Sequence, residues 1–395
     1  MHKPYFSIVI PTKNRPDYLR ESVLSALLQN FEDFEVIVSD NFNDERTKNV
    51  IEQFKDNPKL KYFRTEQEMN MLDHWEFATL KAIGKYVILL PDRKVLYQNS
   101  LKKLYTILRK HQEKINVCSY GVKMFDDENK KMGWNFETLK TQFFKSKKLI
   151  DVFVNENYYS DKSMDSYLPK TLNGGYKNEF AEKVRKLNGH YFNTPGVTTP
   201  DYSSCFINLA LNDEILFVGE TIILSQGEKN SNGRNFGKGY FHSYMNALKI
   251  QDPYKLVPIK APFIYNLLIS DLLIIKSAFE HNLKNITPNW ANFFVANYDE
   301  FLMKKNAKLI SEKELSYFFE EWKNGLQLFD KNIQASVNSS IHNTEKNTSK
   351  KLNYFKNLRL HTKDFINHRF SQNTLINKLM KHRFKNAISA AGFNS

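Results

Sequence analysis

Two groups of residues have the chemistry of a ligand site. The first consists of polar side chains that each follow a short apolar run within the first hundred residues: Thr12, Asn14, Arg15, Asp40, Asn41 and Asp92. The second is a glycine-rich stretch, 226–240, whose cations include Arg234 and Lys238. Glycines let a loop move, and its cations attract anions. Together these groups favour a charged ligand.

The elements that must position these side chains alternate along the chain. Strand-like apolar runs cover 6–10, 34–38, 60–63 and 86–90. Helical spacing covers 15–29, 47–54 and 72–83. Strands separated by helices predict an α/β fold with a mostly parallel sheet and flanking helices. Ligands of such sheets bind beyond the carboxyl ends of the strands, so the polar side chains that follow the strands are expected to meet in one cleft.

The pattern changes after residue 100. Two short strands are expected on either side of Asp126-Asp127, which predicts a hairpin turn there because turns favour Asp and Asn. Helices are expected over 251–340. The most apolar window, 261–279, contains Asp271 and Lys276, which favours a core helix over a membrane span.

Three segments carry a family resemblance: Phe6–Arg15 with Leu19, Val36–Asp44 with Thr47, and Asp73–Glu76 continuing to Gly84–Val87. They resemble glycosyltransferase family 2, and the resemblance extends over residues 5–240. It implies a GT-A fold over 1–250, with a nucleotide-binding half at 1–100 and an acceptor half at 101–250. It also implies an inverting glycosyltransferase, of hexosyl or N-acetylhexosaminyl type, in bacterial surface polysaccharide synthesis.

The resemblance also assigns site residues. The nucleotide of a donor, in most cases a UDP-sugar, would contact Pro11, Thr12, Asn14, Arg15, Asp40, Asn41, Asp73, Pro91, Asp92 and Arg93. Asp40 would accept the imino hydrogen of uracil. Lys94, Arg234 and Lys238 would contact the diphosphate. Asp201 would be the general base that deprotonates a hydroxyl of the glycan or lipid-linked glycan acceptor. The alternative for Asp201 is the N-cap of a helix over 203–211.

The sequence departs from the family at its acidic metal motif. Where further acids are expected after Asp92, the chain has Arg93 and Lys94. A single carboxylate beside two cations is a weak site for Mg²⁺ or Mn²⁺. Three interpretations follow: a metal held by Asp92 and the diphosphate, a cation that replaces the metal, or a catalytically impaired glycan-binding or assembly protein that keeps the fold.

Charge and cysteines bear on partners and location. The net charge of +14 fits anionic ligands, but no nucleic-acid motif occurs, so nucleic acid is not an expected partner. Two isolated cysteines fit the cytoplasm. In the tail, 341–395, the stretch from 343 has eleven Lys and Arg against two acids among apolar residues. It predicts either peripheral contact with the inner face of the membrane or a helical segment that packs on the catalytic part or makes a homo-oligomer.

Overall fold

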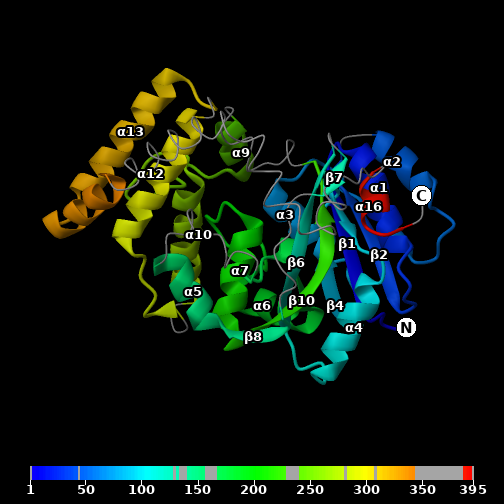
Figure 1. The fold of residues 1–395 in the computed structure, drawn as a ribbon. Helices are drawn as coiled ribbons and strands as arrows, with labels where there is room; N and C mark the ends of the chain where they lie inside the picture. Colours follow the sequence, from blue (N-terminus) through cyan, green and yellow to red (C-terminus); the bar gives the residue numbers. More distant parts are fainter. Residues whose placement is uncertain are drawn as a thin grey trace, which may run out of the picture.

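The computed structural model describes residues 2–42, 45–127, 130–132, 140–155, 167–227, 240–279, 283–306, 309–342 and 386–393. A sheet with flanking helices is joined to a helical region whose last long helices, α12 and α13, are yellow and orange in Figure 1. This arrangement confirms the expected α/β class with a helical C-terminal region. The helices of the sheet-containing part are α1 Pro16–Leu27, α2 Glu45–Glu52, α3 Met71–Thr79, α4 Ser100–Lys110, α5 Ser146–Asn155, α6 Asn178–Asn188 and α7 Pro200–Leu211.

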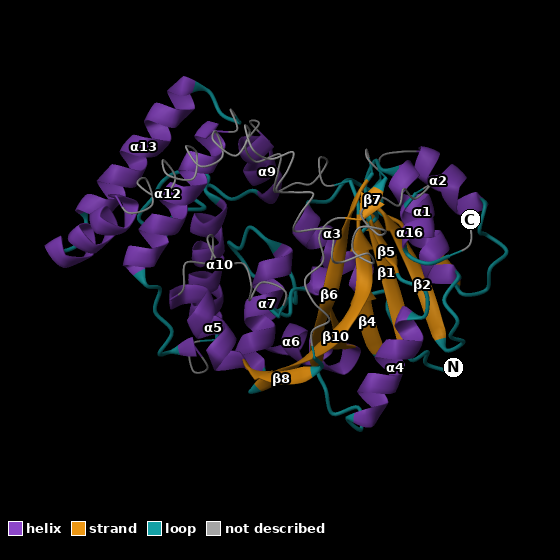
Figure 2. Ribbon diagram, in the orientation of Figure 1, coloured by secondary structure: helices purple, strands orange, loops and turns teal. Residues whose placement is uncertain are grey.

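The sheet has a parallel half and a mixed half. Its strands are β1 Phe6–Thr12, β2 Phe34–Asp40, β3 Leu60–Arg64, β4 Tyr86–Leu89, β5 Lys94–Leu96, β6 Val117–Asp126, β7 Lys131–Met132, β8 Gln142–Lys145, β9 Gly174–Lys177 and β10 Glu214–Ser225. The order is β3-β2-β1-β4-β9-β6-β10-β5, with β7 beside β6 and β8 beside β10. The first four strands are parallel, as expected, whereas β9 runs antiparallel to both β4 and β6. Figure 2 shows the strands side by side.

Alternate residues of the parallel strands face different helices. Ile8, Ile10 and Val36 share a core with α1, α2 and α4. Val9 and Ile37 share another core with α3, α6 and α7. The side-chain period of two therefore gives each strand two buried faces.

Helix α3 ends at Thr79, earlier than its apolar spacing predicts. Gly84 consequently does not cap the helix and instead lies against β1. A Cβ atom there would be 2.6 Å from Ser7 Oγ, so glycine is required for this close approach.

The C-terminal region consists of α9 Tyr240–Leu248, α10 Ile264–Ala278, α12 Trp290–Asn306, α13 Glu312–Gln327 and a helical stretch over 331–342. It shares one continuous core with the sheet-containing part, because Phe263, Leu268 and Phe293 belong to the same buried cluster as Phe206 of α7. Among the described residues, every helix is too short or too polar to cross a bilayer.

The described end of the tail packs on the sheet-containing part. It contains α16 Ala387–Ala390, drawn in red beside α1 in Figure 1. Ile388 and Phe393 are buried against Val95 and Leu224. The rest of the predicted tail, from 343 to 385, lies outside the described residues.

Candidate functional site

The side chains that follow the parallel strands form a row, as their positions predict. In the register of the sheet, Thr12 at the end of β1 pairs with Asp40 at the end of β2, which pairs with Arg64 at the end of β3. Thr12 Oγ1 donates a 2.9 Å hydrogen bond to Asp92, which follows β4. Arg15, before the first turn of α1, lies 3.5 Å from the same carboxylate. Four strands thus bring carboxylates and cations together at one edge.

Asp40 is held by β3. The Tyr62 hydroxyl donates a 2.8 Å hydrogen bond to Asp40 Oδ2, and Arg64 Nε lies 3.7 Å from the same oxygen. Burial, followed by this hydrogen bond, raises the pKa of Tyr62, so the hydroxyl stays a donor. The carboxylate is therefore fixed in orientation, which suits the recognition of a hydrogen-bond donor. Sequence reasoning did not select Tyr62, which belongs to the strand-like run 60–63, or Arg64, with which the structure extends that strand.

Asp92 lies in a tight turn between β4 and β5. Lys94 N donates to Pro91 O at 2.8 Å and closes the turn, which directs the Asp92 side chain inward to 2% exposure. Burial raises the pKa of Asp92, while Arg15, Thr12 and Arg93 act in the opposite direction. This carboxylate is thus surrounded by donors and cations.

These surroundings do not fit a divalent metal ion. Mg²⁺ and Mn²⁺ need several oxygen ligands, with carboxylates preferred. Asp92 has its oxygens engaged by Thr12 and Arg15, and two cations follow it in the chain. The described residues also contain no cluster of three or more Asp, Glu, His or Cys suited to a metal.

The two cations after Asp92 point in different directions. Arg93 Nη1 donates to the carbonyls of Gln226 and Gly227, at 2.9 and 3.0 Å. Lys94 is 8% exposed and donates to Leu172 O at 2.6 Å. Its ammonium acts electrostatically on Asp201. Lys94 thereby connects the row of strand-end residues to the predicted base.

Asp201 lies in the first turn of α7, which begins at Pro200 and has Thr199 as its N-cap. The alternative of an N-cap at Asp201 is therefore wrong: proline fits the first helical position, and the helix starts earlier than its apolar spacing indicates. Burial raises the pKa of Asp201, opposed by Lys170, by the backbone N–H groups of Asp201 and Tyr202, and by Lys94. A carboxylate with a raised pKa has the property that a general base needs. Sequence reasoning missed Lys170, whose ammonium lies 5.1 Å from the centre of the Tyr202 ring.

Four other residues were predicted to contact the nucleotide, and two of them, Asn41 and Asp73, have hydrogen-bond partners within the protein. Asn41 makes two 2.8 Å hydrogen bonds with the backbone of Met69. Asp73, at the start of α3, accepts from Asn70 and Asn193. Asn14 is exposed in the turn before α1 with φ of 56°, a left-handed conformation that Asn tolerates. Pro11 is buried at the end of β1.

The glycine-rich loop begins at a well-anchored point. Arg234 and Lys238 lie outside the described residues. Before them, Gly227 N donates to Asp127 at 3.1 Å, and the Tyr18 hydroxyl donates to the same carboxylate at 3.0 Å. Strands β6 and β7 pair on either side of Asp127, which confirms the predicted hairpin.

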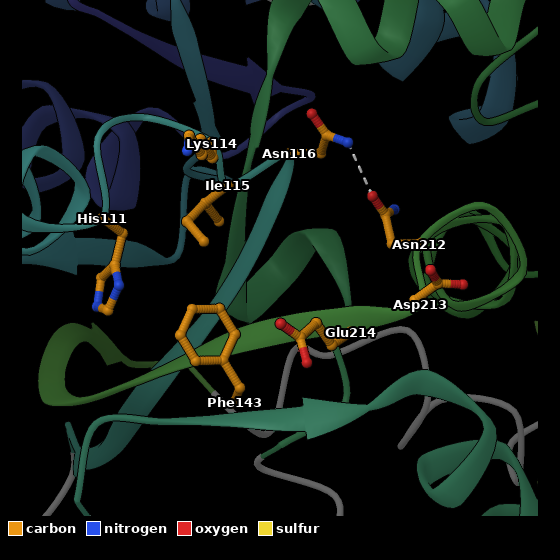
Figure 3. Close-up of a pocket in the computed structure, with 8 residues that line it drawn as sticks. All are labelled: His111, Lys114, Ile115, Asn116, Phe143, Asn212, Asp213 and Glu214. Atoms are coloured by element: carbon orange, nitrogen blue, oxygen red, sulfur yellow. Dashed lines mark hydrogen bonds between the residues drawn. The ribbon is translucent and has the colours of Figure 1, made fainter.

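A cleft of about 410 Å³ lies away from this site, at the start of β6 and β10. Figure 3 shows Phe143 of β8 facing His111, with Glu214 beside them. The rings of His111 and Phe143 meet edge to face at 5.1 Å. None of the residues predicted for the functional site lines this cleft.

Comparison with known sequences identifies relatives of the first half of the chain. Residues 7–164 match the sequence model of the family described as Glycosyl transferase family 2. A protein of Rickettsia felis named "Uncharacterized glycosyltransferase" is 30% identical over 128 residues, 32% of this chain and 21% of the relative. The GalNAc(5)-diNAcBac-PP-undecaprenol beta-1,3-glucosyltransferase of Campylobacter jejuni is 32% identical over 110 residues, 26% of this chain and 33% of the relative. The chain thus spans a third or less of the length of these two curated relatives.

Among solved structures, S. aureus TarS residues 1–349 in complex with UDP-GlcNAc aligns with a TM-score of 0.47 and 15% identity. The alignment covers 87% of this chain and 92% of the TarS chain. The same fragment alone aligns with a TM-score of 0.46 and 16% identity.

Proposed function

We propose that this chain carries a glycosyltransferase family 2 domain of GT-A fold and moves a sugar from a UDP-sugar to a hydroxyl of a glycan, with inversion. The match of residues 7–164 to the sequence model of that family supports the proposal. One observation carries the proposal. The row formed by Arg64, Asp40, Thr12 and Asp92 continues through Lys94, which acts electrostatically on the half-buried Asp201. A nucleotide seat and a candidate base thus belong to one connected site.

The row suits the nucleotide half of the donor. Asp40, oriented by Tyr62, accepts the imino hydrogen of uracil. Thr12 and Arg15 border the ribose and diphosphate, and Arg15, Arg93 and Lys94 supply positive charge where the diphosphate leaves. Arg234 and Lys238 add to this charge from the glycine-rich loop.

The transfer step follows from the position of Asp201. The acceptor hydroxyl oxygen attacks the anomeric carbon from the face opposite the nucleotide and forms the new glycosidic bond. The bond from that carbon to the phosphate oxygen breaks, and the nucleoside diphosphate leaves with the electron pair. The hydroxyl proton passes to Asp201, which must be ionised beforehand.

The acceptor that we propose is a lipid-linked glycan of bacterial surface polysaccharide synthesis, used at the cytoplasmic face of the membrane. The name of the Campylobacter jejuni relative describes an acceptor of this chemistry. The basic stretch 343–385 would add electrostatic attraction to anionic lipid. Deleting 343–385 is the direct test of that contact, by sedimentation with anionic vesicles.

A hydrolysis screen tests the proposed reaction. UDP-, GDP-, dTDP- and CMP-sugars are incubated with the protein, and release of the nucleotide is measured. Release from UDP-sugars is expected. Calorimetric binding of UDP without any hydrolysis, with or without Mn²⁺, would instead support a glycan-binding or assembly protein.

The pH dependence of the rate tests the base. Asp201 acts when ionised, so the rate rises with pH through its raised pKa. Lys170 and Lys94 are the cations that act on this carboxylate, and both lower its pKa. Lys170→Met removes one of them, so the acidic limb of the rate profile is expected to move to higher pH. Lys170→Arg keeps the charge and serves as the control. An unmoved limb in Lys170→Met contradicts the assignment.

Chelation tests the fixed-charge proposal for the leaving group. Because the surroundings of Asp92 do not fit a metal, treatment with EDTA is expected to leave the rate within about twofold. The positive charge at the leaving group comes from the side chains of Arg15, Arg93 and Lys94, which a chelator does not remove. Lys94→Ala is expected to lower the rate under the same conditions. A loss of tenfold or more with EDTA that Mn²⁺ restores would show that a metal is required.

A further inference from the structure

A buried carboxylate of the helical region is bound to the segment that leads into α7. Asp271 lies in the middle of α10 and is 0% exposed. Its Oδ1 accepts from Thr198 N at 2.7 Å and Thr198 Oγ1 at 3.1 Å. Its Oδ2 accepts from Thr199 N at 2.8 Å and Thr199 Oγ1 at 2.5 Å. A buried carboxylate is costly unless such donors surround it, so its presence within the most apolar helix calls for a reason.

These hydrogen bonds change the capping of α7. Thr199 is the N-cap residue, yet its side chain makes no hydrogen bond to its own helix. An N-cap hydroxyl ordinarily accepts from the N–H groups two and three residues further on, which here belong to Asp201 and Tyr202. The hydroxyl is bound to Asp271 instead. The same two N–H groups act on the carboxylate of Asp201.

The pKa of Asp271 reflects both its burial and the hydrogen bonds from the two threonines. Burial raises its pKa to about 7, and the hydrogen bonds from Thr199 and Thr198 act in the opposite direction. The Tyr244 hydroxyl of α9 donates to Thr198 O at 2.7 Å, so the segment is held from both α9 and α10. Figure 1 shows α10 beside α7, on which it packs.

We propose that Asp271 is a positioning residue for the transfer reaction. By holding the Thr199 hydroxyl, it keeps the N-terminus of α7 for the Asp201 carboxylate and fixes the direction of the base. The helical region thereby contributes to the active site through α10. This inference rests on the proposed role of Asp201.

The test compares three variants with the wild type. Asp271→Asn keeps the size but has one acceptor oxygen, so it cannot hold both threonines and is expected to release the Thr199 hydroxyl to cap α7. The hydrolysis rate with UDP-glucose and UDP-N-acetylglucosamine is expected to fall about 10- to 100-fold, as for a displaced catalytic group. The dissociation constant for UDP is expected to stay within about twofold. Thr199→Val removes the hydroxyl that would compete with the Asp201 carboxylate for the N–H groups of α7. Adding Thr199→Val to Asp271→Asn is therefore expected to restore most of the rate.

Glu300→Gln is the matched control. Glu300 is also 0% exposed, accepts from a backbone N–H at the start of α10, that of Ile264, and forms an ion pair with Lys304 of its own helix. Thermal unfolding is measured for every variant, and Glu300→Gln is expected to lose stability while it keeps its rate.

The outcomes separate the inference from the proposed function. A wild type that hydrolyses no donor overturns the proposed function and the inference with it. An active wild type with an unimpaired Asp271→Asn overturns the inference alone, as does a double variant that is no faster than Asp271→Asn. If Asp271→Asn does not fold, Thr199→Asn gives the decision with Asp271 intact. Asparagine is a strong N-cap whose amide oxygen accepts from the N–H groups of Asp201 and Tyr202, so the rate is expected to fall. A wild-type rate for Thr199→Asn overturns the inference.

Discussion

Replacing Asp201 with asparagine is expected to lower the rate of sugar transfer about 10²- to 10⁴-fold, the range for loss of a general base. Asparagine has the same shape, but its amide does not take up a proton. The proposed nucleotide site lies at the ends of β1, β2 and β4, so the dissociation constant for UDP is expected to stay within about twofold. Initial rates with the donor found by the hydrolysis screen, and calorimetry with UDP, measure the two quantities.

The control for this substitution is Asp213→Asn. Asp213 lines the separate cleft of Figure 3, so its loss removes one negative charge without touching the strand-end row. Both variants must unfold at similar temperatures. A slow Asp201→Asn that also binds UDP poorly would mean that the substitution disturbs the whole site, and an unimpaired one would exclude Asp201 as the base.

The parallel half of the fold was predictable because its signals are local. Apolar runs such as 6–10 and 34–38 identify strands, and parallel order brings their carboxyl ends to one edge. That Thr12, Asp40 and Asp92 lie together could therefore be predicted without any knowledge of packing. The mixed half of the sheet has weaker signals. The sequence of β9, Gly174–Lys177, has two glycines and little apolar character, and its place between β4 and β6 is set by tertiary pairing.

The surroundings of Asp201 illustrate what sequence could not predict. Lys170, Lys94 and Asp271 are distant from Asp201 in the chain and act on it, or on its helix, through packing between separate elements. Sequence reasoning treated Asp271 only as a charge that interrupts an apolar window. The burial of Asp271 depends on hydrogen bonds from Thr198 and Thr199, and no sequence pattern connects these threonines with it.

Asp40→Asn is expected to raise the dissociation constant for UDP about 10- to 100-fold, because a hydrogen bond to a charged group contributes about 1.5–3 kcal/mol. Asparagine keeps the volume of a fully buried side chain, which matters because Asp40 is 0% exposed. Its amide nitrogen would also meet the imino N–H of uracil as a second donor in one of its two orientations. Calorimetry with UDP measures the change.

A second nucleotide separates base recognition from general damage to the site. If Asp40 recognises uracil, Asp40→Asn is expected to bind UDP more weakly than the wild type does. Its affinity for ADP, which is already lower in the wild type, is expected to change little because the diphosphate contacts remain. Tyr62→Phe removes only the hydroxyl that donates to Asp40, so a smaller loss in the same direction is expected. Equal losses of affinity for UDP and ADP would mean that Asp40 maintains the structure of the strand ends and does not recognise the base. Unchanged affinity for UDP would remove Asp40 from the nucleotide seat altogether.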